Sequence, residues 1–193
     1  FVTVRKHITG KLQILAGSAD STDTTRTQLE KPIDDSSVRK LVLARVALRD
    51  TIRWRLVGTS GVNVHTNGGS TAIASLRIQS AGIDTTITDP LELHRLRRIL
   101  IFQPGAPVTI TAATGRNDDV VLFYGHDMRR RFVNNGDGTY TFNIPGERFP
   151  GLRHFGVDAL SRGTLFDDAA AYDSNAWVFP FAVDPGMRDI NRR

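Results

Sequence analysis

The chain of 193 residues contains no cysteine. A disulfide framework, a thiolate nucleophile and a cysteine-ligated metal site are therefore excluded. Aromatic residues make up only 8% of the sequence, so the interleaved stacking side chains of single-strand nucleic-acid binders are scarce.

No apolar run approaches the ~18 residues that a helix needs to cross a bilayer. The start of the chain also lacks the basic and then apolar pattern of a signal peptide. We expect a globular chain without a membrane-spanning helix.

Several motifs of catalytic and nucleotide-binding proteins are missing as well. The phosphate-binding patterns GxxxxGK[ST] and GxGxxG and the nucleophile elbow GxSxG do not occur, which removes support for nucleotide binding and for α/β-hydrolase chemistry. None of the five histidines lies two or four positions from another. We therefore predict no catalytic, cofactor-binding or metal-binding residue and a protein that is not an enzyme. A site assembled from distant residues stays open as an alternative, for example from His126, Asp127, His154 and Asp158.

Lysine is rare, whereas arginine is abundant. The sequence has 4 lysines and 21 arginines, with a net charge of +5. Arginine suits bidentate pairing with carboxylates and phosphates at interfaces, although a solvated surface with scattered arginines fits the same composition. Two basic clusters are candidates for contact with nucleic acid or with the inner surface of a particle. These clusters are Arg129, Arg130 and Arg131, and Arg192 and Arg193 in a basic C-terminal tail over 184–193.

Short alternating apolar runs separated by turn residues dominate the rest of the sequence. The alternation over 1–15 predicts an N-terminal strand or arm. Residues 38–57 alternate too, and their β-branched and aromatic side chains favour strands that are bent or interrupted near 49–50, although a helix fits the spacing of the arginines. The polar composition of 16–37 predicts a long connection. The glycine-rich and asparagine-rich stretch 58–69 predicts a loop or weak hairpin.

The stretch 75–99 predicts a β-hairpin followed by a helix. Its apolar residues alternate on both sides of a turn at Ala81 and Gly82. Asp89 is suited to cap a helix, Pro90 to occupy its first position, and Glu92 follows three residues after the cap. Further strands are expected at 108–112, 120–124, 129–133, 139–144, 153–160 and 176–183, with the strongest hairpin signal at 134–138.

This rhythm of strands and turns indicates one all-β domain over 1–193. We predict an antiparallel jelly-roll sandwich or barrel of about eight strands, with one short helix near 90–98. Alternating strands and helices of the βαβ type are absent from the pattern, and no repeat of 20–50 residues is present.

Three passages carry a resemblance to a known family. They are VRKLVLARVALRDTIRWRLVG, SLRIQSAGIDTTITDPLELHRLRRI and DALSRGTLFDDAAAYDSNAWVFPFAV. In their order and strand rhythm they resemble the single jelly-roll capsid proteins of icosahedral tailless viruses and phages. The resemblance implies a structural virion protein that is assembled in the host cytoplasm into an icosahedral capsid. Its main partner would be itself, with other coat proteins, nucleic acid or a membrane as further partners, and with no cofactor or small-molecule substrate.

Assembly of this kind needs contacts between subunits, and the charge pattern supplies candidates. In the strand interpretation of 38–57 the arginines there all point away from the core. We predict that they pair across subunits with loop aspartates. The predicted intersubunit residues are Arg45, Arg49, Arg53, Arg55, Asp118, Asp119, Asp167 and Asp168.

Two other classes of function remain open. A secreted β-sandwich binding module, such as a carbohydrate-binding or adhesin domain, would use aromatic side chains to stack on sugar rings. Its candidates are Trp54, Trp177, Tyr124 and Tyr172. A jelly-roll enzyme would need the composite site of histidines and aspartates described above.

Overall fold

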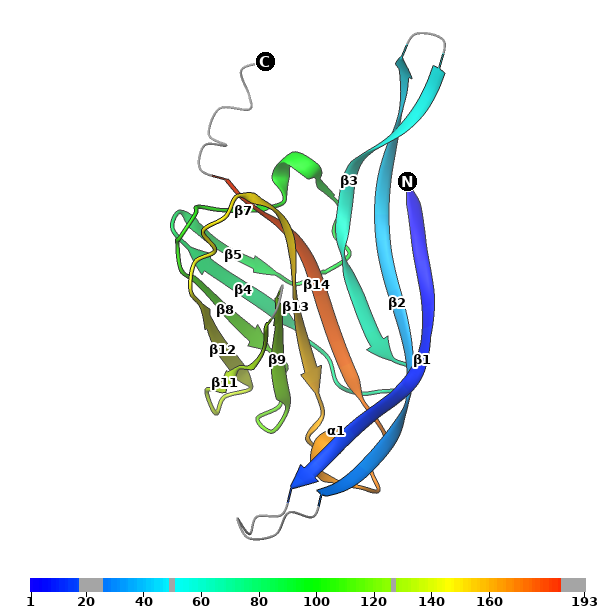
Figure 1. Cartoon of the computed structure of the whole chain (residues 1–193), viewed down its shortest axis with the longest axis vertical. Coiled ribbons are helices and arrows are strands. Elements are labelled where there is room, and N and C mark those ends of the chain that lie inside the picture. Colours follow the sequence, from blue (N-terminus) through cyan, green and yellow to red (C-terminus); the bar gives the residue numbers. More distant parts are fainter. Residues whose placement is uncertain (18–25, 49–50, 126–127, 185–193) are drawn as a thin grey trace.

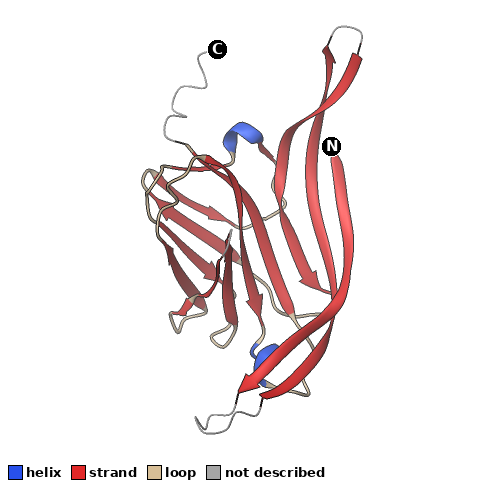
Figure 2. Ribbon diagram, viewed as in Figure 1, coloured by secondary structure: helices blue, strands red, loops and turns tan. Residues whose placement is uncertain are grey.

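The structure is a computed structural model that describes residues 1–17, 26–48, 51–125 and 128–184. Two β-sheets pack face to face, and nearly all strand pairs are antiparallel (Figures 1 and 2). The large sheet has the order β1 (Val2–Gly17), β2 (Arg26–Leu48), β3 (Thr51–Thr66), β14 (Ser174–Val183), β13 (Gly151–Leu160), β9 (Val120–Gly125) and β10 (Met128–Arg131). Its short additions are β6 (His94–Arg95), which pairs with β3, and β7 (Leu100–Phe102), which runs parallel to β14.

The small sheet has the order β11 (Val133–Asn134), β12 (Thr139–Ile144), β8 (Val108–Ala113), β4 (Ser75–Ser80) and β5 (Ile83–Ile87). The prediction of an all-β antiparallel sandwich is confirmed. The described residues form more strands than the predicted eight, since several are two or three residues long and leave no apolar pattern in the sequence.

The hydrophobic core lies between the two sheets. Strands β13 and β14 alternate so that Val157 and Trp177 face inward, opposite residues such as Ile78 and Ile110 of the small sheet. These side chains are at most 4% exposed. Phenylalanine rings extend the core along its length, with Phe155 in contact with the rings of several others. The core therefore draws on both sheets but only on the part of the chain from Ile73 onward.

The first three strands form a long antiparallel ribbon that extends past the sandwich at both ends (Figure 1). β3 pairs with β14 over only four residues, Val62 to His65, and with the two-residue strand β6 at Gly58 and Thr59. No side chain of residues 2–15 is buried, and Ile73 is the first buried hydrophobic residue along the described chain. The ribbon is thus held mainly by backbone pairing rather than by a core of its own.

Two sequence predictions in this region are wrong. Residues 26–37 belong to β2 rather than to a connection, and the expected loop at 58–69 is the second half of β3 up to Thr66. Polar residues form these strands because pairing along a ribbon supplies the backbone hydrogen bonds without requiring apolar side chains. Pro32 fits within β2 because β3 begins to pair with β2 only at Asp35. At Pro32 only β1 lies beside β2, so the missing N–H group of the proline breaks no hydrogen bond to β3.

The segment expected to form a helix near 90–98 forms only one turn of 3-10 helix, Leu96–Arg98 (η1). Asp89 caps a turn rather than the predicted helix, since its carboxylate accepts a hydrogen bond from the Leu91 amide at 2.8 Å. The chain then leaves the turn because His94 and Arg95 pair with β3. The α-helix of the described residues lies elsewhere, at Arg162–Phe166 (α1), where Ser161 caps its first turn.

The hairpins predicted from turn residues are confirmed. Ala81 and Gly82 connect β4 and β5, and Gly82 adopts a positive φ of 75°. The stretch 134–138 connects β11 and β12, and Gly136 and Gly138 both have positive φ angles. Glycine is required at these positions because side chains rarely adopt that conformation. The predicted tail at 184–193 lies outside the described residues except for Asp184.

Candidate functional site

One face of the ribbon carries most of its apolar side chains. Residues paired directly across two antiparallel strands project to the same side, so Val2 lies beside Leu41 and Ile14 beside Leu29. The exposed fraction is 44% for Val2 and 40% for Ile8. We call this surface the apolar ribbon face. It consists of Val2, Val4, Ile8, Leu12, Ile14, Leu29, Ile33 and Leu41, all half-buried or exposed.

The same face continues over the outer side of the large sheet, away from the core. Register connects Arg39 of β2 with Val62 of β3 and then with Val178 of β14. A hollow of about 700 Å³ lies on this outer side. Its lining combines apolar residues of β14 with a cluster of polar groups around Asp35 and Asp158. The large sheet therefore presents one extended surface of mixed character that the small sheet does not cover.

Tyrosines hold the two carboxylates in this hollow. The hydroxyl of Tyr124 donates to Asp158 at 3.2 Å, and the hydroxyl of Tyr172 donates to Asp35 at 3.3 Å. Burial raises the pKa of Asp158 to about 6 and that of Tyr172 to about 12. The second carboxylate oxygen of Asp158 is buried without a hydrogen-bond partner among the described residues. Asp158 is thus a buried acid with one unpaired oxygen, and among the described residues no second catalytic group is in contact with it.

The structure separates the predicted intersubunit arginines. β2 and β3 pair antiparallel up to Leu48 and Thr51, and Arg49 lies outside the described residues. Arg45 is paired with Trp54, whereas Arg53 is paired with Val46 and Arg55 with Ala44. Positions that differ by one along a strand face opposite ways, so Arg45 lies on one face of the ribbon and the other two lie on the opposite face. All three are exposed, but they do not form the single row that the sequence suggested. Their role between subunits stays a prediction.

The loop aspartates are also of different kinds. Asp118 is exposed, whereas Asp119 is 1% exposed and lies 3.5 Å from the guanidinium of Arg116. Burial raises the pKa of Asp119. This carboxylate faces the interior of its own subunit and is unsuited to pair with a neighbour.

Asp167 and Asp168 lie after α1 and are exposed. The carboxylate of Asp167 accepts a hydrogen bond from the Ala169 amide at 2.9 Å, while its backbone carbonyl accepts one from the Lys31 ammonium at 2.6 Å. Lys31 also donates to the carbonyl of Gly163 at 2.9 Å and is only 3% exposed. A cation at the C-terminal end of a helix is favourable. The hydrogen bonds of Lys31 therefore connect the ribbon to α1 and, through α1, to the sandwich.

Arg129, Arg130 and Arg131 lie on β10, at the edge of the large sheet, and all three are exposed. The guanidinium of Arg129 covers the ring of Tyr124 at 4.9 Å from its centre. Arg192 and Arg193 lie outside the described residues. Contact of these arginines with nucleic acid stays a prediction.

The aromatic residues proposed for a sugar-binding module are not gathered into one platform. Trp177 is 4% exposed and belongs to the core, and Arg129 lies over Tyr124. Trp54 is 67% exposed but stands on the ribbon. A surface for stacking sugar rings would therefore have to be built from a single exposed tryptophan.

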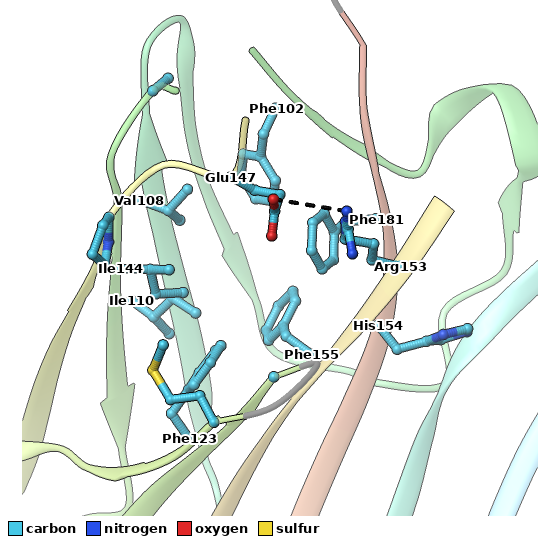
Figure 3. Close-up of a pocket in the computed structure, with 14 residues that line it drawn as sticks. Phe102, Val108, Ile110, Phe123, Ile144, Glu147, Arg153, His154, Phe155 and Phe181 are labelled. Atoms are coloured by element: carbon cyan, nitrogen blue, oxygen red, sulfur yellow. Dashed lines mark ion pairs between the residues drawn. The ribbon is translucent and has the colours of Figure 1, made fainter. Parts of the chain in front are cut away.

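A cavity of about 340 Å³ opens between the two sheets, where β12 leads into β13 (Figure 3). Figure 3 shows apolar side chains from both sheets directed into one space, with Glu147 and Arg153 beside it. An amino group of the Arg153 guanidinium lies 3.7 Å from the Glu147 carboxylate. The apolar lining consists of Phe102, Ala106, Val108, Ile110, Phe123, Met128, Ile144, Pro145, Phe155 and Phe181.

The sequence analysis did not single out Arg153, although a signal was present. The predicted strand 153–160 alternates, and Arg153 shares the parity of Phe155 and Val157, which face the core. A charged residue in the inward register of a strand is a reason to expect a buried polar site.

The described residues contain no group of three or more histidine, aspartate or glutamate side chains placed to hold a metal ion. His126 and Asp127, named for a composite site, lie outside them. His154 and Asp158 share a face of β13, four positions apart. No helix among the described residues is both long and apolar enough to cross a membrane.

Comparison with known proteins places the chain in no family: no protein-family model, no curated protein and no solved structure matches it.

Proposed function

We propose that this chain is a structural subunit that packs with copies of itself into a shell, the role of the capsid barrels that its sequence resembles. The observation that supports this function is the ribbon of β1–β3. About seventy residues precede Ile73, and the described ones add no buried hydrophobic side chain to the core. An isolated strand pair of this length is marginally stable in water without an apolar face that is covered. A neighbouring subunit that packs on the apolar ribbon face is the simplest way to remove this face from water.

The edge of the sheet adds to this argument. β1 is an edge strand of 16 residues with exposed apolar side chains, and its outer backbone groups have no partner strand among the described residues. Natural proteins usually shorten or protect such edges because they pair readily with other chains. A long unprotected edge therefore favours a protein that is built to associate. The virion as its location, and other coat proteins as further partners, belong to the same proposal.

The test compares two substitutions on β1 that differ only in the face they change. Val4 on the apolar ribbon face is paired with Arg39, and Thr3 on the opposite face is paired with Lys40. A glutamate at either position therefore lies opposite a basic residue and is tolerated within the subunit. Particle size is measured by negative-stain microscopy and by light scattering after size exclusion.

We expect large homomeric particles for the wild-type chain and for Thr3→Glu, and small species for Val4→Glu. The reason is that Val4→Glu places a charge on a surface that must lose water on assembly. A monodisperse wild-type monomer, or equal assembly of both variants, contradicts the proposal. Binding of that monomer to a glycan array would favour the alternative of a sugar-binding module.

A further inference from the structure

The cavity between the sheets has the size and lining of a site for a small ligand. Ligand pockets are commonly about 300–1,000 Å³ and mainly apolar, with a few polar groups that fix orientation. At about 30 Å³ for each water-sized group, a cavity of about 340 Å³ accommodates roughly ten such groups. Five of its lining residues are phenylalanine or isoleucine from the middle of the core: Phe102, Ile110, Phe123, Phe155 and Phe181.

Arg153 gives the apolar cavity a charged end. Its position on β13 has the same parity as Phe155, and it is paired with Phe181 of β14, so its side chain lies on the core side of the large sheet. His154 points away from the rings in Figure 3. The Nε atom of Arg153 is buried and has no hydrogen-bond partner among the described residues. A buried guanidinium N–H without an acceptor is costly, so Arg153 lacks a full set of acceptors among the described residues.

Glu147 does not satisfy this group. One of its carboxylate oxygens lies 3.7 Å from Nη2 of Arg153, which is longer than a charge-assisted hydrogen bond of about 2.7–2.9 Å. One of its oxygens instead accepts from the Arg148 amide at 3.2 Å and lies 3.5 Å from the Phe149 amide. The backbone carbonyl of Glu147 accepts from the Gly105 amide at 2.7 Å, which fixes this segment at the rim of the cavity. The Arg153 side chain is 22% exposed and makes no hydrogen bond to Glu147, so its amino groups can still donate to a ligand.

We propose that this cavity binds a single-chain amphiphile with a chain of about ten carbon-sized groups and a carboxylate head. The chain lies among the phenylalanine and isoleucine side chains, and the carboxylate accepts hydrogen bonds from the amino groups of the Arg153 guanidinium. Arginine suits this role because its planar guanidinium matches a carboxylate in a bidentate pair. The proposal concerns a bound ligand rather than a substrate, and it does not depend on assembly of the subunits.

The probe is sodium decanoate, titrated into the full chain by calorimetry below the concentration at which it forms micelles. Uncharged 1-decanol and cationic decyltrimethylammonium are the matched ligands. We expect one saturable site for decanoate and affinities lower by about tenfold or more for both other ligands, because only the carboxylate accepts from Arg153. This comparison uses the wild-type chain alone, so it does not depend on how a variant folds.

Three variants complete the test. Arg153→Gln is expected to weaken decanoate binding by about tenfold or more, and Ile144→Phe to weaken it by narrowing the cavity. Arg148→Gln removes the same charge from an exposed neighbouring residue and should leave binding within about twofold of wild type. Equal binding of decanol and decanoate, no loss in Arg153→Gln, or no saturable heat for decanoate would overturn the proposal.

Discussion

Asp158 is the residue at which stability should depend most clearly on pH. Burial raises its pKa from 3.8 to about 6, so the folded chain binds a proton more tightly than the unfolded chain does. Between these two values, the folded state is protonated where the unfolded state is not, and stability rises as the pH falls. Above about pH 6 the cost of the buried charge is fully present, and a shift of this size corresponds to roughly 2–3 kcal/mol.

Asp158→Asn should therefore stabilise the fold at pH 8 by up to about 2 kcal/mol and flatten the rise in stability between pH 6 and pH 4. The amide oxygen of asparagine can still accept the hydrogen bond of Tyr124. Urea unfolding at several pH values measures the effect, with the exposed Asp168→Asn as the control. An unchanged pH profile in Asp158→Asn would show that this carboxylate is not the source of the dependence.

Lys31 is a second residue with a measurable structural role. Its ammonium is buried and donates hydrogen bonds to the backbone carbonyls of Gly163 and Asp167, so its removal leaves those carbonyls without their charged donor. Lys31→Met should lower the free energy of unfolding by about 1–3 kcal/mol. Thermal unfolding followed by circular dichroism measures this, with Lys11→Met on the exposed side of β1 as the control. Equal unfolding temperatures for the two variants would contradict the role of Lys31.

At the scale of elements, the sequence predicted those strands whose side chains alternate between core and solvent. The runs at 139–144, 153–160 and 176–183 correspond closely to β12, β13 and β14 because each has one buried face. Residues 26–37 gave no such signal because they are paired in a ribbon that has no core. The ending of the expected helix near 90–98 was also invisible in the sequence, since it depends on pairing of His94 and Arg95 with a distant strand.

The candidate site shows the same limit. Alternation alone indicates that Arg153 faces inward, but the cavity beside it depends on how the turn at 103–107 meets the segment after β12. The prediction that Arg45, Arg53 and Arg55 share a face assumed that one alternation continues across 38–57, whether the strands there are bent or interrupted near 49–50. A hairpin reverses the chain and changes which of them face the same side.

β1 is the element whose removal best separates folding from association. It contributes no residue to the core, and its pairing partner is β2 at the outer end of the large sheet. Deletion of residues 1–17 should therefore leave the β-sheet circular dichroism of the sandwich and abolish assembly. Size exclusion with light scattering, beside circular dichroism, measures both properties on one sample. A deleted chain that still assembles would exclude β1 as the contact, and one that fails to fold would show that the ribbon is part of the folding unit.

At the scale of the whole molecule, the chain combines a packed sandwich with a ribbon that has little packing of its own. The sandwich contains the buried hydrophobic residues, whereas the ribbon contributes buried polar groups such as Lys31, Asp35 and Thr66 at the places where it contacts α1 and β14. Local stability follows buried contacts, so different parts of one fold open with different free energies. The ribbon should therefore be the least stable part of a free subunit and should gain most from association.

Hydrogen exchange can test this difference directly. Every second amide of β1 faces the free edge of the sheet, and the others pair with β2 in an exposed ribbon. In the Val4→Glu variant, which should not assemble, the amides of β1 should exchange much faster than those of β14, which lies between β3 and β13. In wild-type particles the β1 amides should become protected, while β14 is slow in both samples and serves as the internal reference. Slow exchange of the β1 amides in the free variant would mean that the ribbon is stable without a neighbouring subunit. That result would contradict the proposal that association stabilises the ribbon.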